Sequence, residues 1–246
     1  MRKSFWAAFA ATTFVIALAP AASAHASSDL WADWEQAHGI GVVEVPGGHD
    51  VIWSSEYIQG STPEGDWTHD VYGRTVRGTS ASADKTLVSA DEAQEPASCA
   101  RTKDGHILVT FEDGNDPDDY GVMQRYAILD DNLNPIVGYD AGKTIIRKGG
   151  HSGHVAAMGN KFVTAVDDGW VSKDGYKNNG TGEDVYLSVM NSAGGSKKTI
   201  RVMDTKKDRF DWPVIAASSR NALLVWQKIV PGKNYTYLMT ASYQAG

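Results

Sequence analysis

Aromatic residues next to charged ones are the feature of this sequence best suited to bind a ligand. Arg209, Asp211 and Trp212 stand together within four consecutive residues. An indole ring stacks on the face of a sugar, while a carboxylate and a planar guanidinium hydrogen-bond its hydroxyls. This composition predicts a sugar site. The full set of candidate ligand-binding residues is Trp67, His151, His154, Trp170, Arg209, Asp211 and Trp212.

Paired carboxylates are the second feature with chemical potential. Hydrolysis of a glycosidic bond requires two carboxyl groups roughly 5 to 10 Å apart across a cleft. Asp167 or Asp168, placed opposite Asp211 or Asp113, could supply such a pair. The candidate catalytic residues are therefore Asp167, Asp168 and Asp211. Because aspartates also fill turns for reasons of backbone geometry, a role limited to solvated loops is the alternative.

An acidic run is a candidate calcium site. Asp113, Asp116 and Asp118 present carboxylate oxygens at nearly alternate positions, and calcium prefers oxygen ligands. The run does not match the twelve-residue calcium loop of EF-hand proteins. Pro117 makes an exposed turn an equally good explanation. Calcium is the one cofactor that the sequence allows for.

The histidine pair and the single cysteine favour structural roles. His151 and His154 are three residues apart, and on a strand this spacing points two side chains to opposite sides. A zinc site is therefore not expected there. Cys99 has an apolar setting and no base near it in the sequence, so we expect a small buried side chain and not a nucleophile.

A repeat organises these residues along the chain. Four strand-like segments end in a bulky apolar residue followed by a polar one: Trp53-Ser54, Phe111-Glu112, Val166-Asp167 and Trp226-Gln227. The bulky residues are 58, 55 and 60 positions apart. Each segment follows a short turn, mostly of Gly or Asn, and an earlier apolar strand, which together predict a β-hairpin. With a second hairpin after it, each unit of about 55 residues describes one propeller blade.

The sequence therefore predicts an all-β, β-propeller-like fold of about four four-stranded antiparallel blades. The repeats cover residues 38–90, 91–148, 149–208 and 209–246, and the last one lacks its fourth strand. The segment 29–36, with two tryptophans, could supply that strand and close the ring. The alternatives are that another copy of the chain completes the ring, or that the chain belongs to a longer propeller.

Loop lengths predict which face of the propeller is functional. Successive connections in an antiparallel meander alternate between the two ends of the sheet. The first and third connections of each repeat are short turns, while the second connections and those between repeats are predicted to be long. The long loops then gather on one face, and binding residues favour loops on a rigid scaffold.

The N-terminus indicates export. Residues 1–24 combine two positive charges, an apolar stretch and small residues before a cleavage site, the pattern of a signal peptide. We expect one domain over residues 25–246, secreted or periplasmic, from a bacterium. Loss of Arg2 and Lys3 takes the net charge from −7 to −9. An acidic surface repels phosphate backbones and anionic lipid, so nucleic acid and membrane insertion are not expected.

These repeats resemble bacterial secreted β-propellers of the sialidase-like type, whose units run from an inner strand through a strand that ends in an aromatic residue to a short turn. The resemblance covers nearly the whole mature chain and is one of architecture. The Asp-box turn of that family is absent, and the nearest stretch, Ser192–Ser196, lacks both its Asp and its Trp. Sialidases also use an arginine cluster and a tyrosine nucleophile, which an acidic face suits poorly. No catalytic residue is therefore carried over.

Three functions are compatible with these observations. We favour a non-catalytic module that binds an extracellular or cell-wall glycan, because no acid–base pattern stands out from ordinary turn chemistry. The second is a glycoside hydrolase with a carboxylate pair. The third is a scaffold that binds a protein of the cell envelope. Fold alone does not decide among them, because propellers host unrelated functions.

Overall fold

The chain is all-β, as predicted, and its described residues contain no helix. The structure is a computed structural model that describes residues 38–56, 69–114, 122–140, 142–168, 184–204, 209–230 and 232–245. The predicted signal peptide and the segment 29–36 lie outside these residues, so both stay predictions. No described residues form a helix long and apolar enough to cross a membrane.

Within the part of the chain that the structure describes, seventeen strands form four antiparallel sheets, which we number in chain order. Sheet 1 contains β1 (His38–Val45), β2 (Gly48–Glu56), β3 (His69–Arg77), β4 (Ser80–Ala81) and β5 (Lys85–Val88). Sheet 2 contains β6 (Ser98–Arg101), β7 (Ile107–Asp113), β8 (Met123–Leu129), β9 (Pro135–Val137) and β10 (Ile145–Lys148). Sheet 3 contains β11 (Gly150–Met158), β12 (Lys161–Asp168), β13 (Asp184–Asn191) and β14 (Lys198–Asp204). Sheet 4 contains β15 (Arg209–Ala217), β16 (Asn221–Ile229) and β17 (Thr236–Gln244).

Each sheet is a meander whose first strand lies innermost. The order is β1-β2-β3-β4 in sheet 1 and β11-β12-β13-β14 in sheet 3, so neighbours in the chain are neighbours in the sheet. In sheet 2 the outer position beyond β8 is shared by β9 and β10. The innermost strands β1, β6, β11 and β15 follow one another side by side, each packing on the next. This is the arrangement of blades in a propeller.

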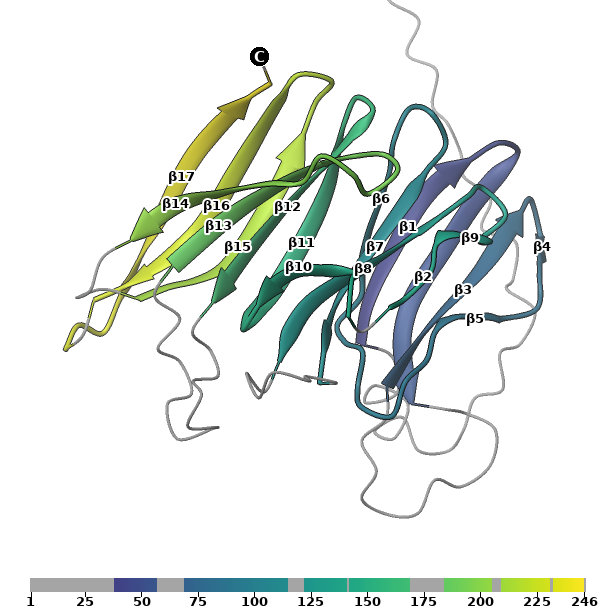
Figure 1. The fold of residues 1–246 in the computed structure, drawn as a ribbon, viewed down its shortest axis with the longest axis horizontal. Helices are drawn as coiled ribbons and strands as arrows, with labels where there is room; N and C mark the ends of the chain where they lie inside the picture. The colour runs from purple at the N-terminus through teal and green to yellow at the C-terminus, as the bar shows by residue number, and fades with distance from the viewer. Residues whose placement is uncertain are drawn as a thin grey trace, which may run out of the picture.

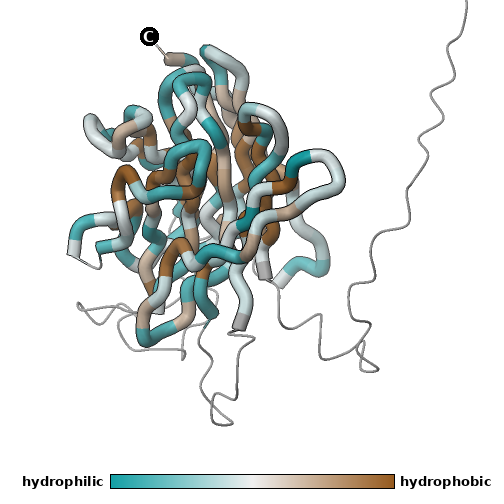
Figure 2. The backbone as a smooth tube through the Cα atoms, turned by 90° about the vertical axis from the view of Figure 1, so that its right-hand side faces the viewer, coloured by the Kyte–Doolittle hydropathy of each residue, from teal (hydrophilic) through white to brown (hydrophobic). Residues whose placement is uncertain are grey.

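The sheets stack face to face in chain order, from β1–β5 at one end to β15–β17 at the other (Figure 1). Apolar residues alternate along the strands and form three clusters, one at each junction between successive sheets. Hydrophobic segments accordingly gather inside the body, and most turns are hydrophilic (Figure 2). The described residues of sheets 1 and 4 do not pack against each other, so this stack of four sheets has two ends.

The connections between sheets are shorter than the sequence predicted. Only Gly149 separates β10 from β11, and its φ of 66° makes the tight turn possible. Four residues, 205–208, separate β14 from β15. The prediction of long loops between repeats is thus wrong at these two junctions. At the first of them the reason is that β10 pairs antiparallel with β8, on which β11 also packs, so the end of β10 lies close to the start of β11.

Innermost strands share a β-bulge near their start. Register shifts interrupt β1 after His38, β11 after His151 and β15 after Asp211. The next residue in each case has a positive φ: 69° at Gly39, 51° at Ser152 and 53° at Trp212. A bulge re-aims the backbone and side chains locally. In this fold it turns backbone N–H groups toward the preceding sheet.

Candidate functional site

The polar residue that follows the bulky apolar residue in the second strand of each repeat faces the following sheet. In β2, β7 and β12 this residue accepts a hydrogen bond from a backbone N–H at or just before the next innermost strand. The three pairs are Ala97 N to Ser54 Oγ at 3.2 Å, Ser152 N to Glu112 Oε1 at 2.8 Å, and Trp212 N to Asp167 Oδ2 at 2.7 Å. The sequence repeat therefore marks a repeated contact between sheets. Two of its acceptors are carboxylates, and they lie on either side of β11.

His151 joins those two carboxylates. Its Nε2 is 3.2 Å from Glu112 Oε2, and its Nδ1 is 3.6 Å from Asp167 Oδ1. The hydroxyl of Ser152 lies 2.5 Å from the same Nδ1. Glu112, His151 and Asp167 come from β7, β11 and β12, so the cluster spans the junction of sheets 2 and 3 and continues toward sheet 4.

Asp211 adds a third carboxylate from β15. Its side chain is fully buried, and Arg209 donates to its Oδ2 at 2.8 Å. The Oδ1 atom has no hydrogen-bond partner among the described residues. Arg209 is partly exposed and so places a cation at the edge of the buried group. We refer to Glu112, His151, Asp167, Arg209 and Asp211 as the His151 cluster.

Burial brings the pKa values of two acids of the cluster close to neutral pH. It raises the pKa of Glu112 to about 7, although the His151 imidazole and the Ser152 N–H act in the opposite direction. It also raises the pKa of Asp211 to about 6, with Arg209 opposing and Asp167 adding to the effect. The pKa of Asp167 is raised by burial as well. Burial alone would lower the pKa of His151, but Asp167 and Glu112 outweigh it and raise it.

Trp212 forms the exposed edge of this cluster. Its φ of 53° is unusual for a large side chain, and such strain persists only where surrounding contacts impose it. Here the Asp167 carboxylate holds the Trp212 N–H at 2.7 Å. The indole is nevertheless 46% exposed. The result is a partly exposed aromatic side chain on a backbone that the cluster holds in place.

The structure brings together four of the predicted residues. His151, Arg209, Asp211 and Trp212 gather with the candidate acid Asp167 at the start of β11 and β15. Residues 209–212 are the first residues of the innermost strand β15. Trp67 and Trp170 lie outside the described residues.

Asp168 and His154 point elsewhere. Successive residues of a strand face opposite sides of the sheet, so Asp168 turns away from Asp167. It accepts a hydrogen bond from Arg147 Nε at 2.8 Å, and burial raises its pKa. Asp168 is thus engaged on the other face of sheet 3. His154 follows the bulge, is exposed and lies outside the His151 cluster. Among the described residues, neither this histidine pair nor any other set of side chains forms a group of three or more that could hold a metal ion.

The Asp113 carboxylate is already bound by neighbouring side chains. Its Oδ2 is 2.6 Å from Arg125 Nε, and both side chains are fully buried. Tyr139 donates to the same oxygen at 2.7 Å. This carboxylate therefore neutralises an arginine within sheet 2 and does not face solvent as a calcium ligand would. Asp116 and Asp118 lie outside the described residues, and calcium binding there stays a prediction.

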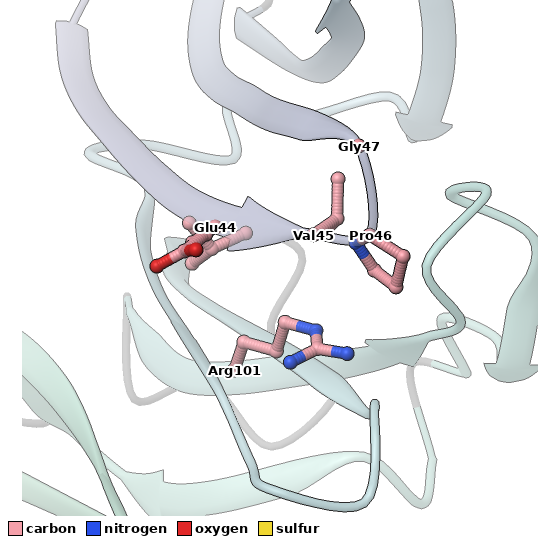
Figure 3. Close-up of a pocket in the computed structure, with 6 residues that line it drawn as sticks. Glu44, Val45, Pro46, Gly47 and Arg101 are labelled. Carbon is pink, nitrogen blue, oxygen red and sulfur yellow. The ribbon is translucent and has the colours of Figure 1, made fainter.

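Two cavities lie along the innermost strands. One of about 270 Å³ is lined by β1, β6 and β11, including Cys99, Ser152 and His154. Burial raises the pKa of the Cys99 thiol to about 12, so this thiol stays protonated. Its side chain is partly buried, and not fully buried as we expected. The other, of about 560 Å³, lies at the β1–β2 turn, where Arg101 extends beneath Pro46 (Figure 3). Asp131 binds that guanidinium at 2.6 and 2.7 Å, so the charge is already paired.

Comparisons with known proteins give a fold and no family. No family model matches the chain, and no curated protein matches its sequence. Trypanosoma rangeli sialidase is similar in structure, with a TM-score of 0.53 and 11% identity over 84% of this chain and 36% of that one. An α-L-arabinofuranosidase from Lactobacillus brevis has a TM-score of 0.48 and 9% identity over 82% and 71% of the two chains. For an endo-arabinase from Bacteroides thetaiotaomicron the values are 0.48, 9%, 84% and 75%. The sialidase comparison agrees with the propeller-like architecture predicted from the repeats.

Sequence reasoning missed the roles of Glu112 and Ser152. From the sequence, Glu112 was noted only as the polar residue after Phe111, although the same position in the next repeat is Asp167. Aligning the repeats position by position would have paired these two acids. The role of Ser152 could not be predicted, because neither its residue type nor its neighbours indicate a left-handed backbone.

Proposed function

We propose that this chain binds a glycan at the surface formed by Trp212 and Arg209. The observation that supports this most strongly is the strained, partly exposed Trp212, whose backbone is held by the buried Asp167. A fixed indole loses little conformational entropy when a sugar ring stacks on it. Arg209, at the same end of β15, can donate to hydroxyls, since only part of its guanidinium is engaged by Asp211.

Calorimetric titration with soluble cell-wall and extracellular glycans tests this proposal. Trp212→Ala should abolish binding, while Trp212→Phe should keep part of it because a ring face remains. Tyr235→Ala is the matched control, since Tyr235 is an aromatic residue of similar exposure directly before β17. Glycan binding that survives Trp212→Ala unchanged would contradict the proposal.

Glycoside hydrolysis is the second candidate function, and Glu112 favours it. A carboxyl group with a pKa of about 7 is half protonated at neutral pH and can give a proton to a leaving oxygen. Asp211, with its pKa of about 6, would be the ionised partner. Both acids are largely or fully buried, so a substrate would have to enter between β11 and β15 to reach them.

Turnover assays separate the two candidates. A panel of chromogenic glycosides should be hydrolysed with a pH profile that depends on Glu112, and Glu112→Gln should lower the rate by two or more orders of magnitude. If glycans that stack on Trp212 are bound but none is hydrolysed, the binding function stands and the hydrolytic function is excluded.

The setting proposed for this function is outside the cytoplasm. The signal-peptide pattern of residues 1–24 supports a secreted or periplasmic location, where extracellular or cell-wall glycans are available. A protein of the envelope is the alternative partner from the sequence. Cell fractionation and sequencing of the mature N-terminus would test export directly.

A further inference from the structure

The two ends of the stack expose positions that are buried at every junction inside it. Leu223 in β16 occupies the repeat position of Leu108 in β7 and Val163 in β12, three residues before the bulky apolar residue. Leu108 and Val163 are fully buried against the following sheet, whereas Leu223 is 49% exposed. The outer face of sheet 4 thus has the residues of a junction but no following sheet.

Sheet 1 shows the complementary feature. Val42 in β1 occupies the position of Val155 in β11 and Ile215 in β15, as their pairing with the second strand of each sheet shows. Val155 is buried in the junction of sheets 2 and 3, and Ile215 packs into that of sheets 3 and 4. Val42 is 60% exposed. The outer face of sheet 1 lacks a preceding sheet.

Each end also carries one half of the repeated hydrogen bond. Gln227 holds the acceptor position of Ser54, Glu112 and Asp167, and its side chain makes no hydrogen bond among the described residues. At the other end Gly39 holds the bulge position of Ser152 and Trp212, with the same left-handed backbone. At two of the three interior junctions this bulge supplies the N–H donor, and at the first Ala97, just before β6, supplies it. The donor half at sheet 1 therefore matches the acceptor half at sheet 4.

We propose that a second copy of this chain packs its sheet 1 on sheet 4 of the first, with Gly39 N–H donating to Gln227. Sheet 1 of this same chain has the matching face, because it carries an exposed junction residue, a bulge and an N–H donor at the equivalent positions. This contact repeats the three junctions already present in the fold. Two copies related by a two-fold axis make the contact twice and close a ring of eight sheets, within the range of known propellers.

The size of the contact suits a stable dimer. Three strands of sheet 4, each nine residues long, cover a flat footprint of about 30 by 14 Å. Both end faces of each chain take part, which gives roughly 800 Å² per chain, the size of a standard interface. Leucine and valine side chains at the centre supply the apolar contact.

Light scattering coupled to gel filtration of the purified chain tests the proposal. The expected mass is twice that of one chain. Val42→Glu and Leu223→Glu should each reduce it to one chain, because each variant places a charge in one of the two end faces. Ile136→Glu, at an exposed apolar residue of β9, is the matched control and should leave the dimer intact. Circular dichroism confirms that each variant is folded.

Mixing the two variants tests which faces meet. The Val42→Glu chain keeps an intact sheet 4 and the Leu223→Glu chain keeps an intact sheet 1, so an equimolar mixture should form a dimer again through one contact. Gln227→Ala should weaken the wild-type dimer at least about tenfold, because the contact is made twice and two hydrogen bonds are lost. A chain that is monomeric at all concentrations would overturn the proposal. A dimer that survives either charged variant would overturn it as well.

Discussion

At Ser152 and Trp212 the backbone takes a left-handed conformation that glycine adopts without cost. Ser152 additionally places its hydroxyl 2.5 Å from His151 Nδ1. Ser152→Gly and Ser152→Ala both remove the hydroxyl, but only the glycine variant relieves the backbone. We therefore expect Ser152→Gly to be more stable than Ser152→Ala by about 1 kcal/mol. Urea unfolding of the two variants measures this difference.

The comparison between the two Ser152 variants isolates backbone strain from the contact with His151. If both variants unfold at the same urea concentration, the left-handed backbone costs nothing and the bulge is not strained. Ser192→Gly and Ser192→Ala give a control pair at a serine without a positive φ. There the glycine variant should be the less stable one, because its unfolded chain gains more entropy.

The pKa shifts in the His151 cluster predict a protein that loses stability as the pH rises. Burial raises the folded-state pKa of Glu112 from 4.5 to about 7, so the folded chain keeps a proton that the unfolded chain has already lost. Ionisation of Glu112 between these values costs up to about 3 kcal/mol of folding free energy. Asp211 acts in the same direction between pH 3.8 and about 6. The raised pKa of His151 adds stability below about 6.5 that is lost at higher pH.

Urea unfolding at pH 5 and pH 8 measures this loss. Glu112→Gln should reduce the difference between the two values by about 2 kcal/mol, because glutamine does not ionise. Glu92→Gln, at an exposed glutamate, should leave the difference unchanged. A wild-type protein that is more stable at pH 8 than at pH 5 would contradict the expected burial of Glu112.

Part of this site could be predicted from residue types, whereas the rest depends on backbone conformation. His151, Arg209, Asp211 and Trp212 could be selected because an aromatic residue near carboxylates and an arginine is typical of sugar sites. Asp167 and Asp168 could not be told apart without knowing which of them faces the next sheet. Glu112 was reachable through the repeat, whereas the bulge at Ser152 was not.

At the level of elements, the buried pair in sheet 2 fixes β7 against β8. Asp113 and Arg125 are both fully buried and 2.6 Å apart, and Tyr139 also binds the carboxylate. Arg125→Met removes the cation and leaves Asp113 uncompensated, which should cost about 3 to 5 kcal/mol. The double variant with Asp113→Leu should recover much of this loss. Urea unfolding provides the values.

An exposed pair provides the control for this prediction. Arg74 and Asp84 are each about two-fifths exposed, so Arg74→Ala should cost less than about 1 kcal/mol. Equal losses for Arg125→Met and Arg74→Ala would mean that burial does not decide the contribution of an ion pair in this fold.

Strands and their order were predictable because period-2 patterns and Gly or Asn turns have local causes. The lengths of the connections between sheets were not, since they depend on where an outermost strand ends relative to the next innermost one. In sheet 2 the two short strands β9 and β10 share the edge of β8, as β4 and β5 share the edge of β3 in sheet 1, whereas the repeat predicted a single outer strand in each. Local sequence thus determines the hairpins, and packing determines how they are joined.

For the whole molecule, stacking gives the inner sheets two neighbours and the end sheets one. Stability in such an array is distributed through nearest-neighbour contacts. In a monomeric chain carrying both Val42→Glu and Leu223→Glu, we expect the amides of β2 and β16 to exchange faster with deuterium than those of β7 and β12. Their opening needs the loss of one junction, whereas opening sheet 2 or 3 needs the loss of two. Mass spectrometry of exchanged peptides resolves the four strands, and equal rates in all of them would show that the sheets open only together.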